Sequence, residues 1–219
     1  MFNKSFITLI IFSILSLLQI EATEPLPDPY SGVTVLPFDG HGWYGGNKAQ
    51  IEKLFQQYEI QVVIEVGCWL GESTRHIASL LPSGGKVYAV DHWLGSAEHQ
   101  LGKSAYHPAL PYLYEQFLSN VIHANLTKVI IPIKMDSLTA AKELQARGII
   151  ADLVFIDAGH EEEEVYADLN AWFPFVRSHG ILCGDDWTYP SIRKMVTLFA
   201  SENGLLIDAA DGRFWRLYN

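Results

Sequence analysis

The sequence is short of cysteine and of basic residues, and each shortage excludes a class of protein. Only 2 of the 219 residues are cysteine, which is too few for a domain held together by disulfides. The 15 Lys and Arg residues stand against 25 Asp and Glu, so the formal net charge is −10. Binding to nucleic acid or to anionic lipid needs a basic face, and we therefore expect neither partner.

Apolar residues, in contrast, are plentiful. They make up 49% of the chain while charged residues make up 18%, so a large core can form and disorder is excluded. The length fits one domain. The composition also excludes collagen and simple coiled coils.

The N-terminus differs from the rest of the chain. An apolar run of 15 residues, Phe6 to Ile20, follows Lys4 and precedes a small residue, Ala22. A bilayer span needs about 20 residues, so this run is typical of a signal peptide over residues 1–22. We expect export, to a secreted or periplasmic location, and no stable membrane association after cleavage. The alternative is a retained membrane anchor.

Proline marks the next segment, because four prolines fall between Thr23 and Pro37. We expect an extended lead-in over residues 23–46, followed by one domain over residues 47–219. In that domain, helical and strand patterns alternate. We expect helices over 47–58, 73–81, 111–124, 138–147, 161–176 and 191–202, and strands over 61–66, 86–91, 129–134, 151–157, 181–184, 205–208 and 214–217.

This alternation predicts an α/β fold with a doubly wound, mostly parallel seven-stranded sheet. The strands are apolar enough to be covered by helices on both faces. The last two strands are joined by a short turn at 210–212 and should form an antiparallel hairpin. Cys68 follows the first strand and Cys183 lies in the fifth, and these strands flank a third, so the two are too far apart for a disulfide and we expect free thiols.

The first strand runs into a glycine-containing turn that suits a ligand. Gly67 and Gly71 allow a tight turn, and the helix that follows presents backbone amides near Ser73. The spacing matches neither the phosphate loop nor the dinucleotide fingerprint. Asp91 ends the second strand, 20 residues after Gly71, where an acid can accept hydrogen bonds from ribose hydroxyls. Together these features indicate a nucleoside-bearing cofactor, although Asp91 alone could cap a loop.

The third strand ends at Asp136 and Ser137. This position is suitable for contact with an adenine edge, but the pair is equally an ordinary helix cap.

Acids also follow the fourth and fifth strands. Asp157 and His160 come after one strand, and Asp185 with Asp186 after the other. Three carboxylates at one edge of a sheet would repel one another, and a bound cation would relieve that repulsion. Oxygen ligands suit Mg²⁺ or a similar divalent ion. The alternative is that these acids cap the helices that follow.

At this point the sequence resembles the class I S-adenosylmethionine-dependent methyltransferases, which have a Rossmann-like fold. The resemblance spans roughly residues 40–218. It is carried by the motifs Ile156-Asp157-Ala158-Gly159-His160, Trp172-Phe173-Pro174, Gly184-Asp185-Asp186-Trp187 and Val90-Asp91-His92-Trp93-Leu94-Gly95-Ser96. It implies that Glu65, Gly67 and Gly71 shape the methionine end of the cofactor site. It also implies that Asp91 holds the ribose and that Asp136 and Ser137 lie near adenine.

The metal-dependent O-methyltransferases are similar in the layout of Asp157, Asp185 and Asp186, which implies a metal site. The catechol type places a lysine base three positions after the first acid, and this chain has His160 there. Antibiotic-sugar methyltransferases are similar in their metal acids, so the acceptor stays open. The resemblance implies methyl transfer to a small molecule, through a hydroxyl whose proton His160 takes with metal assistance.

Two other functions stay open. One is an exported small-molecule binding protein on a methyltransferase scaffold, because an exported protein meets little S-adenosylmethionine. The other is a metal-dependent, hydroxylase-like enzyme that uses the same acids. The sequence leaves the oligomeric state open, a homo-oligomer included.

Overall fold

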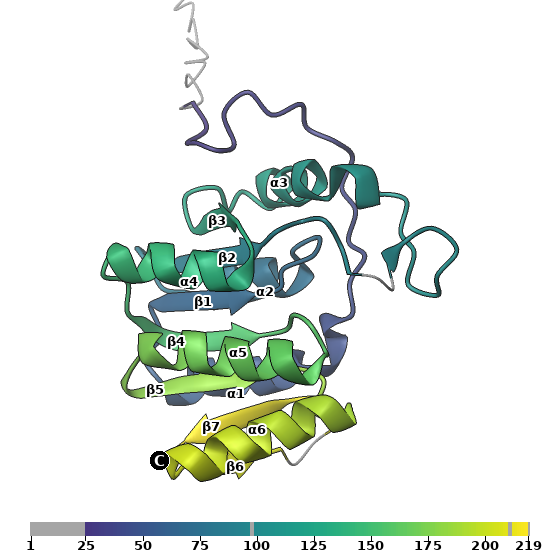
Figure 1. Ribbon diagram of the computed structural model, residues 1–219. Helices are drawn as coiled ribbons and strands as arrows, with labels where there is room; N and C mark the ends of the chain where they lie inside the picture. The colour runs from purple at the N-terminus through teal and green to yellow at the C-terminus, as the bar shows by residue number, and fades with distance from the viewer. Residues whose placement is uncertain (1–24, 97–98, 210–211, 219) are drawn as a thin grey trace, which may run out of the picture.

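A seven-stranded sheet runs through the centre of the molecule (Figure 1). A computed structural model of the protein describes residues 25–96, 99–209 and 212–218, and the predicted signal peptide lies outside them. The strands are β1 (Val62–Val66), β2 (Lys86–Asp91), β3 (Ile130–Lys134), β4 (Ala151–Ile156), β5 (Val176–Gly184), β6 (Leu206–Asp208) and β7 (Trp215–Tyr218). Their order in the sheet is β3-β2-β1-β4-β5-β7-β6. The predicted α/β class and the predicted set of strands are confirmed.

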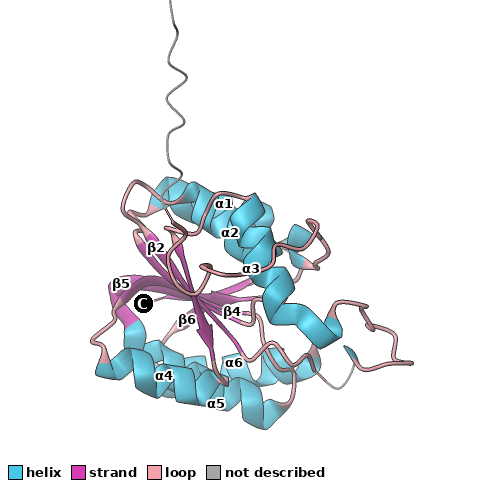
Figure 2. Cartoon of the chain, turned by 90° about the horizontal axis from the view of Figure 1, so that it is seen from above, coloured by secondary structure: helices cyan, strands magenta, loops and turns pink. Residues whose placement is uncertain are grey.

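Helices cover both faces of this sheet. They are α1 (Lys48–Gln57), α2 (Glu72–Leu80), α3 (Leu113–His123), α4 (Ser137–Ala146), α5 (Glu162–Trp172) and α6 (Pro190–Asn203). Figure 2 shows α1, α2 and α3 on one side of the strands and α4, α5 and α6 on the other. None of these helices, which all lie in the described part of the chain, has the length and apolarity needed to cross a bilayer.

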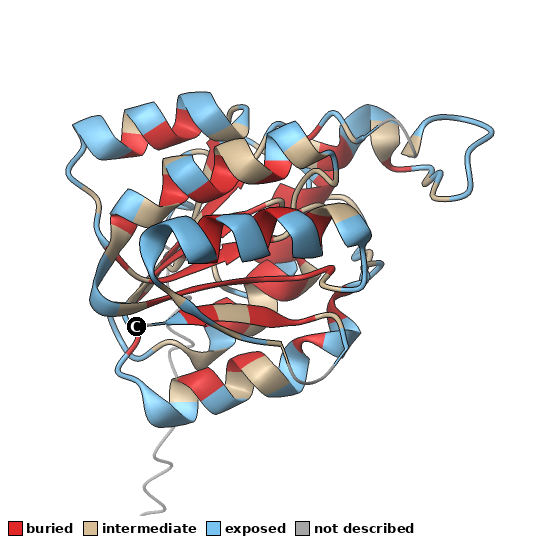
Figure 3. Cartoon of the chain, turned by 60° about the horizontal axis from the view of Figure 1, so that its bottom comes forward, coloured by how far each residue is buried: buried red, intermediate tan, exposed pale blue. Residues whose placement is uncertain are grey.

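The core has two halves because neighbouring strand residues point to opposite faces. On β1, Val63 packs into the core half that contains Ile51 and Phe117, whereas Ile64 packs into the other half. Both of these valine and isoleucine side chains are fully buried, and Figure 3 shows the central strands as buried along most of their length. Cys68 and Cys183 are buried and free, as predicted.

The strands are parallel from β3 to β5, and β7 is antiparallel to both of its neighbours, β5 and β6. The predicted antiparallel C-terminal hairpin is therefore confirmed, although residues 210–211 of its turn lie outside the described residues. Because β7 runs against β5, Trp215 lies opposite Gly184. The residues just before β7 thus come to the carboxyl end of β5.

Two predicted boundaries are wrong. The helix predicted over 161–176 ends at Trp172, and one 3₁₀ turn over Phe173–Phe175 follows, since Pro174 has no backbone N–H to continue the helix. The strand predicted over 181–184 starts earlier, at Val176. Its first half is largely exposed and polar, so it lacks the apolar pattern that marks the second half. Every other boundary lies within two residues of its prediction.

The proline-containing lead-in is packed against the domain over its described part. The buried hydroxyl of Tyr30 donates to the Ile130 carbonyl at 2.9 Å, and the Leu36 amide donates to Ser119 Oγ at 2.9 Å. Asn120, also on α3, exchanges hydrogen bonds with the backbone of Asp39. These contacts hold the lead-in along α3 and bring its end to the edge of the sheet.

Candidate functional site

A cavity of about 340 Å³ opens at the carboxyl ends of the parallel strands. This is the edge at which ligands bind to open α/β sheets, and the volume is in the range of small-molecule sites. Seven residues of the predicted site line it, namely Gly67, Ser73, Asp91, Ser137, Asp157, His160 and Asp186. Asp185 lines a smaller cavity that shares Asp157, His160 and Asp186. Glu65, Gly71 and Asp136 are not among the residues that line either cavity.

Gly67 brings the ends of β1 and β4 together. Its φ is +89°, and a Cβ there would lie 1.8 Å from the carbonyl oxygen of Asp157. The amide of Asp157 in turn donates to the Val66 carbonyl at 2.8 Å. Only glycine permits this approach, and so it places Asp157 beside the turn that follows β1.

Asp91 holds the two loops that border the cavity at this end. Its Oδ2 accepts the amides of Cys68 at 2.9 Å and Trp69 at 3.0 Å, and its Oδ1 accepts the amide of Trp93 at 2.6 Å. A carboxylate offers about four acceptor positions. Asp91 therefore fixes the loops and retains acceptor capacity on the cavity side.

Glu65 lies fully buried at the end of β1. Neither of its carboxylate oxygens has a hydrogen-bond partner among the described residues. Burial raises the pKa of Glu65 to about 7, and the neighbouring Ser73 and Thr74 side chains offset only part of this rise. A buried acid without a partner is unfavourable in its charged form, so this position favours a nearby positive charge.

The third predicted pair, Asp136 and Ser137, has structural roles in α4. Asp136 is the helix N-cap, and its Oδ1 accepts the Thr139 amide at 3.0 Å. Hydrogen bonding from the Thr139 side chain, and then from this amide, lowers the pKa of Asp136. The Ser137 hydroxyl donates to Asp168 and accepts the Trp172 indole N–H at 2.8 Å. The helix-cap alternative thus describes what Asp136 does, and contact with adenine stays a prediction.

Three acids converge at the ends of β4 and β5, as predicted. One carboxylate oxygen from each of Asp157, Asp185 and Asp186 lies within 4.8 Å of the others. Gly184 is needed here because a Cβ would lie 2.3 Å from the ring of Trp215. The Trp215 indole N–H donates to the carbonyl of Asp185 at 2.7 Å, so β7 holds this end of β5 in place.

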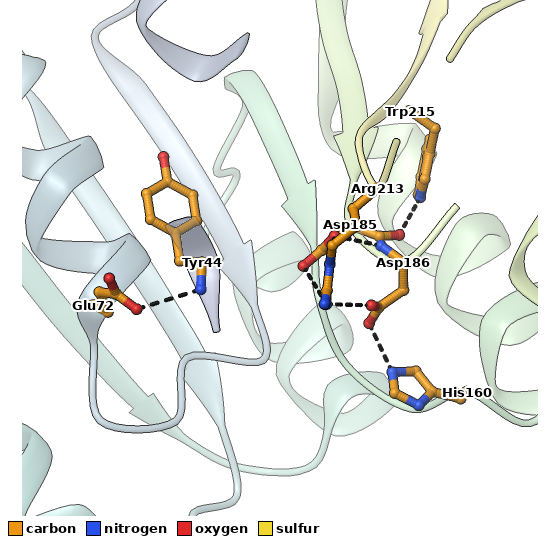
Figure 4. A network of polar contacts seen from close by, with 7 residues as sticks. All are labelled: Tyr44, Glu72, His160, Asp185, Asp186, Arg213 and Trp215. Carbon is orange, nitrogen blue, oxygen red and sulfur yellow. Dashed lines mark hydrogen bonds and ion pairs between the residues drawn. The ribbon is translucent and has the colours of Figure 1, made fainter. Parts of the chain in front are cut away.

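Arg213, which was not predicted from the sequence, lies beside two of these acids, Asp185 and Asp186 (Figure 4). Its Nε and Nη2 donate to Asp185 Oδ1 and Oδ2, each at 3.0 Å, and Nη2 also pairs with Asp186. The pair with Asp185 raises the pKa of Arg213. No hydrogen bond or ion pair reaches the Asp157 carboxylate within the described residues. Burial, together with Asp185 and Asp186, raises the pKa of Asp157 well above its usual value.

His160 is positioned by the same cluster. Its Nε2 lies 2.8 Å from Asp186 Oδ2, and its ring lies 4.4 Å from the ring of Tyr189, measured between centroids. Because Asp186 orients the imidazole, the pair has the form of a general base held by an acid. Both residues face the cavity.

Aromatic residues form one wall of the cavity, and the sequence did not single them out. Trp43 comes from the lead-in and Trp69 from the turn after β1, and their ring centroids are 5.5 Å apart. His99 stacks on Trp43, with centroids 5.6 Å apart. His99 belongs to the loop after β2. The signal for Trp43 was weak, because it stands outside every motif.

Comparisons with known proteins agree with this geometry. The solved structure of an O-methyltransferase from Bacillus cereus in complex with SAH aligns with a TM-score of 0.62 and 19% identity, over 83% of this chain and 84% of that one. The O-methyltransferase TomG from Streptomyces achromogenes, in complex with SAM, aligns with a TM-score of 0.61 and 15% identity, over 84% and 83% of the two chains. These likenesses confirm the fold. A family model described as a methyltransferase domain matches residues 64–187, more than half of the chain. The protein belongs to this methyltransferase family.

Proposed function

We propose that this methyltransferase transfers a methyl group from S-adenosylmethionine to a hydroxyl group of a small molecule. The observation that carries the proposal is the shared cavity, which joins Asp91 at one end to the His160–Asp186 pair at the other. The structural neighbours that contain SAH or SAM support the choice of cofactor.

The residues at the β1–β2 end fit such a cofactor. Asp91 has acceptor capacity for ribose hydroxyls, and the turn at Gly67 lets a ligand approach the backbone. The unpaired carboxylate of Glu65 favours positive charge nearby, and S-adenosylmethionine is cationic. Ser137 lines the wall where adenine is predicted. The cofactor would supply an electrophilic methyl group.

His160 is the proposed general base. With the Nε2 proton donated to Asp186, the imidazole carries its lone pair on Nδ1, and we assign the role of proton acceptor to this atom. An acceptor hydroxyl in the cavity would lose its proton to this nitrogen as its oxygen becomes the nucleophile. Asp186 then stabilises the imidazolium that forms. Positioning of the hydroxyl by the cavity walls supplies much of the remaining rate enhancement.

The metal assistance inferred from the sequence meets an obstacle in the arrangement of side chains. The three carboxylates are of the right chemical type for Mg²⁺. However, Asp185 and Asp186 are already paired with Arg213 and His160. A divalent cation does not fit unless these pairs separate, so we assign no step of the reaction to a metal.

Calorimetry and an activity assay together test this function. The protein should bind S-adenosylhomocysteine in isothermal titration, and a panel of catechols, sugars and amines should reveal methyl uptake by a hydroxyl compound. Failure to bind S-adenosylhomocysteine would favour the small-molecule binding protein. An oxidised product instead of a methylated one would favour the hydroxylase-like enzyme.

We also propose that the protein is exported, on the strength of the apolar run at residues 6–20. N-terminal sequencing of secreted material should then begin near Thr23. Recovery of intact Met1 in a membrane fraction would show that the run is a retained anchor.

A further inference from the structure

The acid cluster at the ends of β4 and β5 contains a cation of its own. Arg213 donates to both oxygens of Asp185 and to one oxygen of Asp186, and His160 contacts the other oxygen of Asp186 at 2.8 Å. Every carboxylate oxygen of these two residues therefore has a partner. Asp157 alone has no such pair within the described residues.

The fold places Arg213 there through several independent contacts. Its carbonyl accepts the Trp187 amide at 2.8 Å, and Trp215, two residues later, is buried against the end of β5. Asp186 has a φ of +63°, a left-handed conformation that is uncommon outside glycine and occurs often at functional sites. The position of Arg213 is therefore set by residues at the end of β5 and at the start of β7, and it does not depend on one exposed side chain.

The guanidinium of Arg213 also has one nitrogen that its ion pairs do not use. Its hydrogen bonds use Nε and Nη2, and Nη1 makes no hydrogen bond with a described residue. Arg213 lines the cavity beside Asp157 and His160. A guanidinium stays charged at every pH at which proteins are studied, and its planar fork matches a carboxylate in two-point contact.

We propose that Arg213 takes the place of a divalent metal ion in this acid cluster, and that it presents Nη1 to the acceptor oxygen. The proposal rests on the proposed function for the identity of the acceptor site. It makes Arg213 a catalytic residue that stabilises negative charge developing on the acceptor oxygen. It also accounts for the convergence of three acids without a metal.

A titration with MgCl₂ alone tests the proposal and needs no substrate. Wild-type protein should show no saturable binding by calorimetry. Arg213→Ala should gain saturable Mg²⁺ binding, because Asp185 and Asp186 lose their guanidinium partner and all three carboxylates can then face one ion. Arg193→Ala removes the same charge from an exposed position on α6 and should behave like wild type. Saturable binding to wild type that is unchanged in Arg213→Ala would overturn the proposal.

Activity gives the second measurement. Wild-type turnover should be unchanged in excess chelator, and Arg213→Ala should lose about 10²–10³-fold in kcat, the cost of one donor to a developing oxyanion. Added guanidinium should restore part of this loss, which a purely structural role would not allow. Loss of wild-type activity in chelator, restored by Mg²⁺, would overturn the proposal.

Two controls keep the outcomes separate. Arg213→Lys retains the charge if the alanine variant fails to fold, and it should bind Mg²⁺ as weakly as wild type does. S-adenosylhomocysteine binding should be near wild type in each variant. If no acceptor is methylated at all, the proposed function fails, while the MgCl₂ titration still decides the role of Arg213.

Discussion

The buried acids at the two ends of the cavity differ in whether they have charged partners. At the β1–β2 end, Glu65 has no hydrogen-bond partner, and Asp91 accepts three backbone amides while the His92 imidazole lies 3.8 Å from its Oδ1. At the β4–β5 end, Asp185 and Asp186 are paired with cationic or ionisable side chains. The first end therefore favours a positively charged ligand. At the second end, two of the three acids are paired internally, and a base and an arginine line the cavity, which suits a neutral hydroxyl acceptor.

The largest effect on turnover is expected at the β4–β5 end of the cavity. His160→Ala should slow turnover by about 10²–10⁴-fold, because the acceptor hydroxyl loses its base. Affinity for S-adenosylhomocysteine should stay near the wild-type value, since His160 serves the acceptor. His123→Ala changes a histidine that does not line the cavity and should leave turnover unchanged. Near-native turnover of His160→Ala would remove this residue from the chemistry.

The raised pKa of Glu65, at the β1–β2 end of the cavity, can be tested through the pH dependence of stability. Burial raises the pKa of Glu65 from 4.5 to about 7, so the folded protein binds a proton that the unfolded chain releases at lower pH. The free energy of unfolding should therefore fall as pH rises from about 4.5 to 7, by on the order of 3 kcal/mol from this group. Glu65→Gln does not titrate and should remove this part of the slope.

Urea unfolding at several pH values measures the difference between the two proteins. Asp168, whose pKa burial raises to about 6, contributes a slope of the same sign in both, so only the difference reports on Glu65. Parallel curves for wild type and Glu65→Gln would show that the carboxylate is not held in the protonated form.

Asp91 offers a way to separate a cofactor residue from a structural one. Asp91→Ala should weaken S-adenosylhomocysteine by about 1.5–3 kcal/mol and should also lower the melting temperature, because three backbone amides lose their acceptor. Asp136→Ala is the matched comparison, since Asp136 caps α4. It should cost about 1 kcal/mol of stability and leave affinity unchanged. Equal losses of affinity in both variants would put Asp136 at the cofactor after all.

Local patterns were sufficient to predict most of the fold. The buried strands are short apolar runs that end at glycine or aspartate, and these signals predicted the seven strands and the convergence of Asp157, Asp185 and Asp186. The first half of β5 was not predicted, because it is largely exposed and polar and so has no apolar pattern to detect.

Arg213 was not predicted to be part of the site, for a different reason. Arg213 meets Asp185 only because β7 enters the sheet between β5 and β6, antiparallel to both. Antiparallel pairing of the last two strands can be read from a short turn, but the position of β7 beside β5 depends on packing of Trp215 against Gly184. Because this contact could not be predicted, the sequence indicated a metal ion as the positive charge that relieves the repulsion among the acids.

The smallest expected effect concerns the aromatic wall, where Trp43 also lay outside every motif. Its side chain is 45% exposed and contacts Trp69 and His99 at the edge of the cavity. Trp43→Ala should raise KM for the acceptor by about 3–10-fold, the scale of one aromatic contact, and leave kcat near wild type. Phe38→Ala changes an exposed ring of the same segment that does not line the cavity and should have no effect. A change in S-adenosylhomocysteine affinity at constant KM would assign Trp43 to the cofactor end, and the acceptor would then have to be placed on the other wall, beside His160 and Tyr189.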